Sequence, residues 1–399
     1  MQAKRLHGLD ALRSSMMLVG FITHAADYYI IQRLFRAEQP NSVLLDITAG
    51  MHRFRMPTFF LLSGFFMALM VAKHGVVGTW ARRVKRVAVP LVVAAVTVLP
   101  VTLWLYFSMV LTILNGRPVL LLGMRQADQL LQQMSAWQVP TFSLMHLWFL
   151  HYLLVLYLLV PIGVLLWRGA AAVTGGMLAR AHATTPWLVF AFVIPTAAAL
   201  WPFRDAVVPV DDRTVFPELG SFVYYAVYFV AGYAIFSHQR VLELFKRRYV
   251  ETGCVAAATL IALFWEGAWL PRSPVLAQSA TVLCASVCSW AGLACLCGLF
   301  MRVFDSTSRH VTFMNDSAYW LYLIQVPMIF AVGIALTPVR GSDVALFGLL
   351  AMLTGILSVG SYLLVKNTWI ASFLEGRWSL GTRFSRARKS LTSATNEAR

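Results

Sequence analysis

The sequence contains few charged residues. Only 13% of its 399 residues are Asp, Glu, Lys or Arg, whereas 59% are hydrophobic and the mean hydropathy is +0.69. Soluble domains carry about 25% charged and about 45–50% apolar residues. The charged side chains cannot cover the surface of soluble domains of this total length, so the composition excludes a water-soluble enzyme. It also excludes a disordered chain. We therefore expect an integral membrane protein.

Cysteine and acidic residues are also scarce. The cysteines lie in or beside apolar segments, without the spacing of a zinc site: Cys254, Cys284, Cys288, Cys295 and Cys297. We predict no disulfide and no metal site, because buried thiols usually behave as small hydrophobic side chains. The 17 acidic residues stand against 33 Lys and Arg, a net charge of +16. The basic residues gather in short clusters between apolar runs, which indicates cytoplasmic loops near anionic lipid rather than nucleic-acid binding.

Ten apolar stretches approach the roughly 20 residues that an α-helix needs to cross the hydrocarbon core of a membrane. They lie near residues 10–32, 54–73, 87–112, 146–167, 187–203, 219–237, 250–270, 277–301, 318–337 and 344–370. The sequence thus predicts an all-α integral membrane protein, a bundle of about ten transmembrane helices. We expect a single polytopic domain at 1–370 and a basic, disordered cytoplasmic tail at 371–399.

The distribution of Lys and Arg predicts the orientation of this bundle. Most of them fall in alternate loops on the side of the N-terminus, so the positive-inside rule places both termini in the cytoplasm. A cleavable signal peptide would need an uninterrupted apolar core. The first stretch is instead interrupted by Asp10, Arg13, His24 and Asp27, so we expect it to be a retained helix.

Ionisable side chains within a membrane span cost several kcal/mol, which makes those of the first stretch candidates for function. Arg13 and His24 are three helical turns plus about 20° apart, so they share one face at a separation of about 16 Å. Asp10 lies three residues before Arg13 and can pair with it. A substrate with phosphates at Arg13 could deliver a reactive end to His24, whose neutral imidazole suits proton transfer. The structural alternative is a boundary ion pair and a histidine that bonds a neighbouring helix.

The second stretch begins with two arginines and contains a Ser-Gly pair. Arg53 and Arg55 precede Pro57 and either snorkel to lipid headgroups or hold an anionic acyl group or acceptor. Ser63 is a candidate for substrate contact or for a nucleophile. However, no nucleophile elbow surrounds it, and small residues such as Ser63 and Gly64 usually permit close helix packing in membranes.

A basic loop follows, and later stretches contain further polar residues. Arg82, Arg83 and Arg86 are either determinants of topology or a binding site for the phosphates of a cytoplasmic donor. His146 and His151 lie about 140° apart on a helix, so they cannot both face one ligand. The candidates for substrate binding in the later stretches are His146, Trp148, Tyr319, Tyr322 and Gln325.

These motifs resemble the membrane acyltransferase family 3. The shared motifs are, in chain order, Asp10-x-x-Arg13 with His24 after ten further residues, Phe59-Phe60-x-x-Ser63-Gly64-Phe65, Arg83-x-x-Arg86 with a nearby proline, and Ser317-x-Tyr319-x-x-Tyr322-Leu323. Two segments are similar to the branch of the family that succinylates osmoregulated periplasmic glucans. They are His146-Leu147-Trp148-Phe149-Leu150 and Arg55-Met56-x-x-Phe59-Phe60.

The resemblance implies transfer from acyl-CoA, succinyl-CoA for this branch, to a hydroxyl of a periplasmic glucan at the bacterial inner membrane. The donor is a substrate, and no permanently bound cofactor is expected; glucan synthases are possible partners. His24 would be essential, and Arg13 would support it or handle the donor. The sequence departs from the family at Gln325, where many relatives have histidine. A glutamine can hydrogen-bond there but cannot accept a proton at neutral pH.

Two rival functions stay open. The first is an O-acetyltransferase of lipopolysaccharide or another envelope polysaccharide, since no motif fixes the acyl group. The second is a transporter of an acylated or anionic solute, because buried Arg, His and Asp also suit solute pathways. The sequence shows no inverted repeat that would favour a transporter. A purely structural membrane protein would leave the Arg13 and His24 face without a purpose.

Overall fold

The computed structural model describes residues 7–123, 126, 144–173, 191–203, 206–208, 217–265, 269–304, 309–368 and 370. The elements are α1 (His7–Phe35), α2 (Ser42–His74), α3 (Val76–Asn115), the short 3-10 helix η1 (Met145–Leu147), α5 (Trp148–Val173), α8 (Val193–Leu200), α9 (Leu219–Ser237), α10 (Gln239–Arg247), α11 (Tyr249–Phe264), α12 (Pro274–Val303), α13 (Arg309–Leu336) and α14 (Asp343–Val365). This part of the chain is helical and contains no strand, in agreement with the expected all-α class. The predicted tail at 371–399 lies outside the described residues.

Seven of the described helical segments are long and apolar enough to cross a membrane. They are α2, α3, η1 with α5, α9, α12, α13 and α14. Each of the ten predicted stretches overlaps a described helix, but α1, α8 and α11 do not belong to this set, and α8 covers only part of the stretch at 187–203. The polar side chains of His24 and Asp27 lower the hydropathy of α1, although its 29 residues are long enough. The chain is a multi-pass membrane protein, and a total of ten spans stays a prediction.

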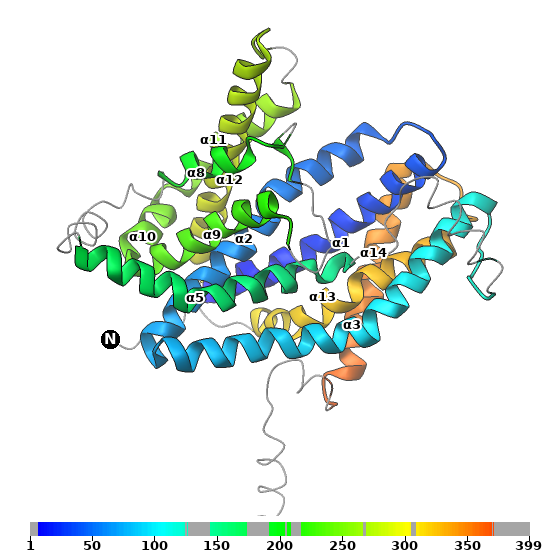
Figure 1. The fold of residues 1–399 in the computed structure, drawn as a ribbon. Coiled ribbons are helices and arrows are strands. Elements are labelled where there is room, and N and C mark those ends of the chain that lie inside the picture. The colour runs from blue at the N-terminus through cyan, green and yellow to red at the C-terminus, as the bar shows by residue number, and fades with distance from the viewer. Residues whose placement is uncertain are drawn as a thin grey trace, which may run out of the picture.

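Helix α1 lies in the middle of the bundle (Figure 1), where it contacts α2, α3, α12, α13 and α14. Glycines permit the closest approaches between helices. A Cβ added at Gly64 of α2 would overlap the carbonyl oxygen of Phe229, and one at Gly232 of α9 would overlap that of Leu61. Gly64 therefore lets α2 and α9 pack backbone to backbone, as the Ser-Gly pair suggested.

The basic residues meet at the end of the bundle where α1 begins. The guanidinium of Arg13 lies 5.6 Å from the ring centre of Phe66, near the end of α2. It also interacts electrostatically with Arg83 and Arg86, near the start of α3. Three arginines of the predicted basic side therefore lie close together at this end of α1, and their cytoplasmic location stays a prediction.

At the opposite end of α1, an ion pair joins this helix to α14. Arg33 donates to both carboxylate oxygens of Asp343, at 3.0 and 2.9 Å, and also pairs with Glu38. Asp343 is the first residue of α14. Helix α1 thus extends from a basic end to this ion pair.

A proline opens a break in the hydrogen bonds of α2. Pro57 has no N–H, so the carbonyl of Arg53 loses its partner within the helix. The hydroxyl of Ser289 in α12 donates to this carbonyl at 2.9 Å. A side chain from a neighbouring helix therefore replaces the lost bond, as membrane-buried backbone requires.

Candidate functional site

One face of α1 carries its ionisable side chains. The helical step of about 100° per residue places Asp10, Arg13, Gly20, His24 and Asp27 within an arc of about 100°. The side chains of Arg13 and Asp10 are 40% and 20% exposed, and those of His24 and Asp27 are 23% and 29% exposed. Their neighbours on the flanks of the helix are mostly buried. The structure thus keeps Arg13 and His24 on one partly accessible face, as the spacing predicted.

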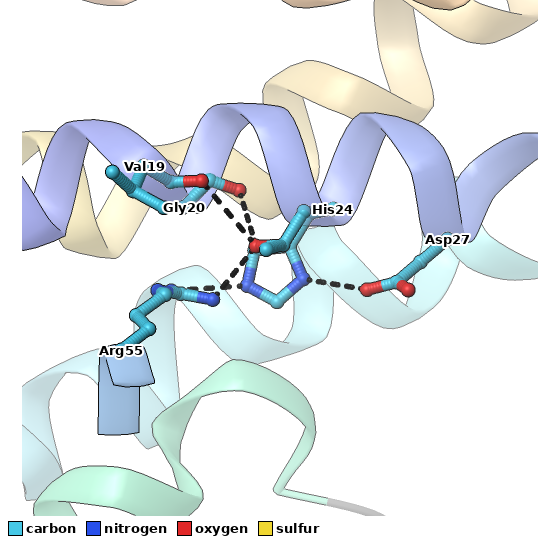
Figure 2. Close-up of polar contacts among 6 residues, drawn as sticks. Val19, Gly20, His24, Asp27 and Arg55 are labelled. Atoms are coloured by element: carbon cyan, nitrogen blue, oxygen red, sulfur yellow. Dashed lines mark hydrogen bonds and ion pairs between the residues drawn. The ribbon is translucent and has the colours of Figure 1, made fainter. Parts of the chain in front are cut away.

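His24 lies between a carboxylate and a guanidinium (Figure 2). Its Nδ1 is 3.3 Å from Oδ2 of Asp27, and its Nε2 is 3.4 Å from Nη2 of Arg55. A carboxylate only accepts hydrogen bonds and a guanidinium only donates them. A neutral imidazole that bonds both groups therefore has its proton on Nδ1 and its lone pair on Nε2. Asp27 thus fixes the tautomer in which Nε2 can accept a proton.

Arg55 connects α2 to this face of α1. Its side chain is 4% exposed, and its Nη1 donates to Oγ1 of Thr23 at 2.8 Å. The Thr23 hydroxyl in turn donates to the carbonyl of Gly20 at 3.1 Å. Arg55 therefore does not snorkel to lipid headgroups. Arg53 points elsewhere, because it is two residues away on the helix, and its Nη1 is 3.4 Å from the carbonyl of Ala206.

Gln325 of α13 contacts α1 at Gly20. A Cβ added at Gly20 would overlap Oε1 of Gln325 and would lie 2.8 Å from Nη2 of Arg55. The side chain of Gln325 is fully buried, and neither atom of its amide has a hydrogen-bond partner among the described residues. Such unpaired buried groups are uncommon in folded proteins. The glycine thus lets two polar side chains meet on α1 between Arg13 and His24.

His146 is held by helix α13. Pro327 has no N–H, so the carbonyl of Leu323 loses its partner within α13. Nε2 of His146 donates to this carbonyl at 2.9 Å, and the hydroxyl of Tyr322 donates to the backbone carbonyl of His146. The bond at Nε2 leaves Nδ1 as an acceptor, for which the described part of the chain provides no partner. His146 and Tyr322 therefore join the start of the fourth predicted span to α13.

The remaining candidates for substrate binding are Trp148, Tyr319 and Ser63. Trp148 belongs to an aromatic cluster, with ring centres 6.4 Å from Phe60 and 5.4 Å from Tyr225. The buried hydroxyl of Tyr319 has no partner within the described ranges. Ser63 is half-buried on α2. Their roles as substrate-binding residues stay predictions.

The donor-side candidates lie at the basic end. Arg83 donates to the carbonyl of Phe66 at 3.4 Å, and Arg82 is exposed. The guanidinium of Arg13 is 3.7 Å from Oδ1 of Asp10. Asp10 is about 21 Å from His24 along the helix, so it pairs with Arg13 and cannot orient the imidazole. No cluster of three or more His, Cys, Asp or Glu that could hold a metal occurs in the part of the chain that the structure describes.

The contacts of His24 with Asp27 and with Arg55 were not predicted from the sequence. Asp27 follows His24 by three residues, the same spacing that pairs Asp10 with Arg13, so a local signal was present. The contact between Arg55 and His24 depends on how α1 and α2 pack. No pattern within either helix predicts it.

The fold and this site belong to a helical membrane transferase, and comparison with known proteins identifies the class. Residues 6–365 match the family described as acyltransferase domain, Acyl_transf_3. The chain therefore belongs to the membrane acyltransferase family 3 and is an acyltransferase. It is similar to Glucans biosynthesis protein C from Salmonella typhi and from Salmonella typhimurium, with 23% identity over 365 residues in each case. These matches cover 90% of this chain and 89% of each relative. No solved structure is significantly similar to it.

Proposed function

We propose that this acyltransferase moves a succinyl group from cytoplasmic succinyl-CoA to a hydroxyl of a periplasmic glucan, across the bacterial inner membrane. The observation that carries this proposal is the position of His24 between Asp27 and Arg55, on the same face of α1 as Arg13. The similarity to Glucans biosynthesis protein C favours a glucan as the acceptor.

His24 would act as the general base. Its Nε2 removes the proton of the acceptor hydroxyl while the hydroxyl oxygen attacks the thioester carbonyl carbon. The C–S bond then breaks, and the leaving thiolate takes the proton from Nε2, which yields the ester and free CoA. Asp27 keeps the proton of Nδ1 in place and stabilises the imidazolium, as in other His-carboxylate pairs.

Arg55 would stabilise the charge that develops during attack. Its Nη2 is 3.4 Å from Nε2 of His24, and its Nη1 is held by Thr23. A fixed guanidinium beside the base can donate to the oxyanion of the tetrahedral intermediate, and such donors act strongly in a site with little water. Arg53 points away from His24, and its Nε has no hydrogen-bond partner among the residues described, so it is a candidate for binding an anionic group of the acceptor.

The donor would bind with its phosphates at the basic end. Arg13, Arg83 and Arg86 interact electrostatically there, and Arg82 is exposed nearby. Arginine is well suited to phosphate oxygens because its guanidinium can form two parallel hydrogen bonds. The separation of about 16 Å between Arg13 and His24 suits an extended pantetheine arm whose thioester reaches the imidazole.

A second route gives the same product through a covalent intermediate. Nε2 of His24 attacks the thioester carbonyl, the thiolate leaves, and the acceptor hydroxyl then displaces the imidazole. Labelled donor without acceptor separates the routes. Rapid quenching would show protein-bound label, lost in His24→Ala, if His24 carries the acyl group, and no bound label if it is only a base.

The function is tested in proteoliposomes with radiolabelled succinyl-CoA and purified glucan. We expect the wild type to label the glucan and His24→Ala to be slower by about 10²-fold or more, the usual contribution of a general base. His74→Ala is the matched control, because His74 is exposed at the end of α2. His24→Ala that inserts normally and works at the wild-type rate would overturn the mechanism. Transfer from acetyl-CoA alone would assign acetyl instead, and solute flux without donor consumption would indicate a transporter.

A further inference from the structure

The accessible face of α1 is interrupted at one position. Arg13 and Met17 are partly exposed on the side of the basic end, and His24 is partly exposed on the other side. Gly20 lies between them and is buried, because Arg55 and Gln325 cover it. A molecule that extends along this face from Arg13 to His24 therefore meets these two side chains.

Gln325 lacks partners at this position. The Gln325 amide has one acceptor and two donor hydrogens, and neither its oxygen nor its nitrogen is bonded within the described part of the chain. The adjacent guanidinium of Arg55 is directed to Thr23 and His24. The amide of Gln325 is thus a free donor and acceptor pair that is completely buried. A ligand with a donor and an acceptor of its own would satisfy both atoms.

The position of Gly20 fits one part of an acyl donor. Along the helix, Gly20 is about 10 Å from Arg13 and about 6 Å from His24. In the pantetheine arm, the inner amide begins three bonds from the sulfur, a reach of about 4–5 Å when extended. With the thioester at His24, this amide therefore falls beside Gly20 and the side chain of Gln325.

We propose that Gln325 binds the inner amide of the pantetheine arm of the acyl donor, and that Gly20, which has no side chain, lets the Gln325 amide lie on this face of α1. The inference rests on the proposed function, because it requires a pantetheine thioester as the donor. Gln325 accepts from the amide N–H and donates to the amide carbonyl. Gln325 is a positioning residue: it sets how far the thioester extends toward His24 and takes no part in proton transfer.

The test compares two donors in the wild type and in Gln325→Met. One donor is acyl-phosphopantetheine, and the other has two methylene groups in place of its inner amide. We expect the wild type to lose about tenfold in kcat/KM with the second donor, the size of an ordinary hydrogen-bond contribution. With acyl-phosphopantetheine, Gln325→Met should have a kcat/KM about tenfold below that of the wild type. Its kcat/KM with the analogue should be nearly the same as with acyl-phosphopantetheine. Ser358→Ala is the control: it removes a buried hydroxyl that, like the Gln325 amide, has no partner among the described residues. This variant should retain the wild-type preference for acyl-phosphopantetheine over the analogue.

The outcomes separate this inference from the proposed function. A wild type that transfers from both donors equally, or a Gln325→Met protein with the wild-type preference, overturns the inference alone. A wild type that transfers from neither thioester overturns the proposed donor and the inference with it. Gln325→Met keeps the volume of the side chain and removes unpaired buried polar atoms, so we expect it to fold. If thermal unfolding shows otherwise, Gln325→Asn withdraws the amide from Gly20 and should show the same loss of preference.

Discussion

The carboxylate of Asp27 accepts from the imidazole of His24 one turn earlier on the same helix, with 3.3 Å between Oδ2 and Nδ1. Because both residues belong to α1, their separation does not depend on the packing of other helices. His24 and Asp27 thus form one rigid unit. Arg55 approaches this unit from α2.

The tautomer argument predicts the effect of removing the charge of Asp27. In Asp27→Asn the amide can donate to Nδ1, which moves the imidazole proton to Nε2 and blocks proton acceptance there. We expect kcat to fall by about 10²–10⁴-fold with little change in donor KM. Initial rates in proteoliposomes measure this. Glu251→Gln, which removes an exposed carboxylate on α11, is the control; equal rates for both variants would refute the role of Asp27.

The guanidinium of Arg55 contacts two residues at once, so we predict that lysine is a poor substitute. Arg55 reaches Thr23 and His24 with two different nitrogens, whereas an ammonium group is a single point of charge. We expect Arg55→Lys to lower kcat by about 10²-fold, as loss of an oxyanion donor does. Steady-state kinetics with saturating donor give the value. Unchanged kcat would mean that the guanidinium only supports packing.

Substitution of an arginine at the basic end should weaken donor binding without slowing the chemical step. A hydrogen bond to a charged group contributes about 1.5–3 kcal/mol, so we expect Arg13→Gln, Arg83→Gln or Arg86→Gln to raise the KM for acyl-CoA roughly tenfold or more. An acyl thioester of N-acetylcysteamine has no phosphate, and its KM should not change. Arg247→Gln on α10 removes an exposed charge and serves as the control. An equal rise in KM with both donors would argue against phosphate binding.

Two glycines should respond differently to alanine. At Gly20 the new Cβ meets the ends of two flexible side chains, Gln325 and Arg55, which can move aside. At Gly232 it meets the backbone of Leu61, which cannot. We expect Gly20→Ala to lower transfer by about tenfold or more with a normal melting temperature, whereas Gly232→Ala should destabilise the fold by about 1–3 kcal/mol. Thermal unfolding and transfer rates measured on the same preparations distinguish the two effects.

Glu218 is the N-cap residue of α9, and its carboxylate predicts a dependence of stability on pH. Burial opposes ionisation of Glu218, but hydrogen bonds from Ser221 and Gly220 outweigh it and lower the pKa of this carboxyl below its usual 4.5. The carboxylate therefore stabilises the folded state above pH 4.5, and this contribution disappears as the pH falls further. We expect Glu218→Ala to cost about 1 kcal/mol at neutral pH, as lost caps do. Melting curves that still differ from wild type in strong acid would contradict this.

Much of the fold could be predicted from the sequence, because a membrane demands long apolar helices. Each predicted stretch overlaps a helix in the described part of the chain, and Arg13 and His24 share a face since that follows from helical geometry alone. The same polar residues explain why α1 has too low a hydropathy to count among the seven apolar spans. The apolar pattern of the sequence predicts α1 as a span, but the hydropathy of the helix falls below that of the seven apolar spans because it carries the candidate site residues.

The candidate site was less predictable, because most of its contacts join different helices. The approach of Arg55 to His24 requires the packing of α1 on α2, and that of Gln325 requires the packing of α13 at Gly20. The bond of His146 to α13 depends on a carbonyl that Pro327 leaves free. Sequence patterns name these residues as polar but cannot say which of them meet.

The carbonyl of Arg53, which has no N–H partner at Pro57, links two helices. Ser289 of α12 is fastened to the backbone of Arg53, only two residues from the guanidinium beside His24. The turn of α2 that bears Arg55 is therefore anchored to α12 as well as to its own helix. A tilt of α12 would displace this turn relative to α1 and change the distance between Arg55 and the imidazole. Helix α12, which contributes no predicted site residue, would in this way alter the geometry of the candidate site.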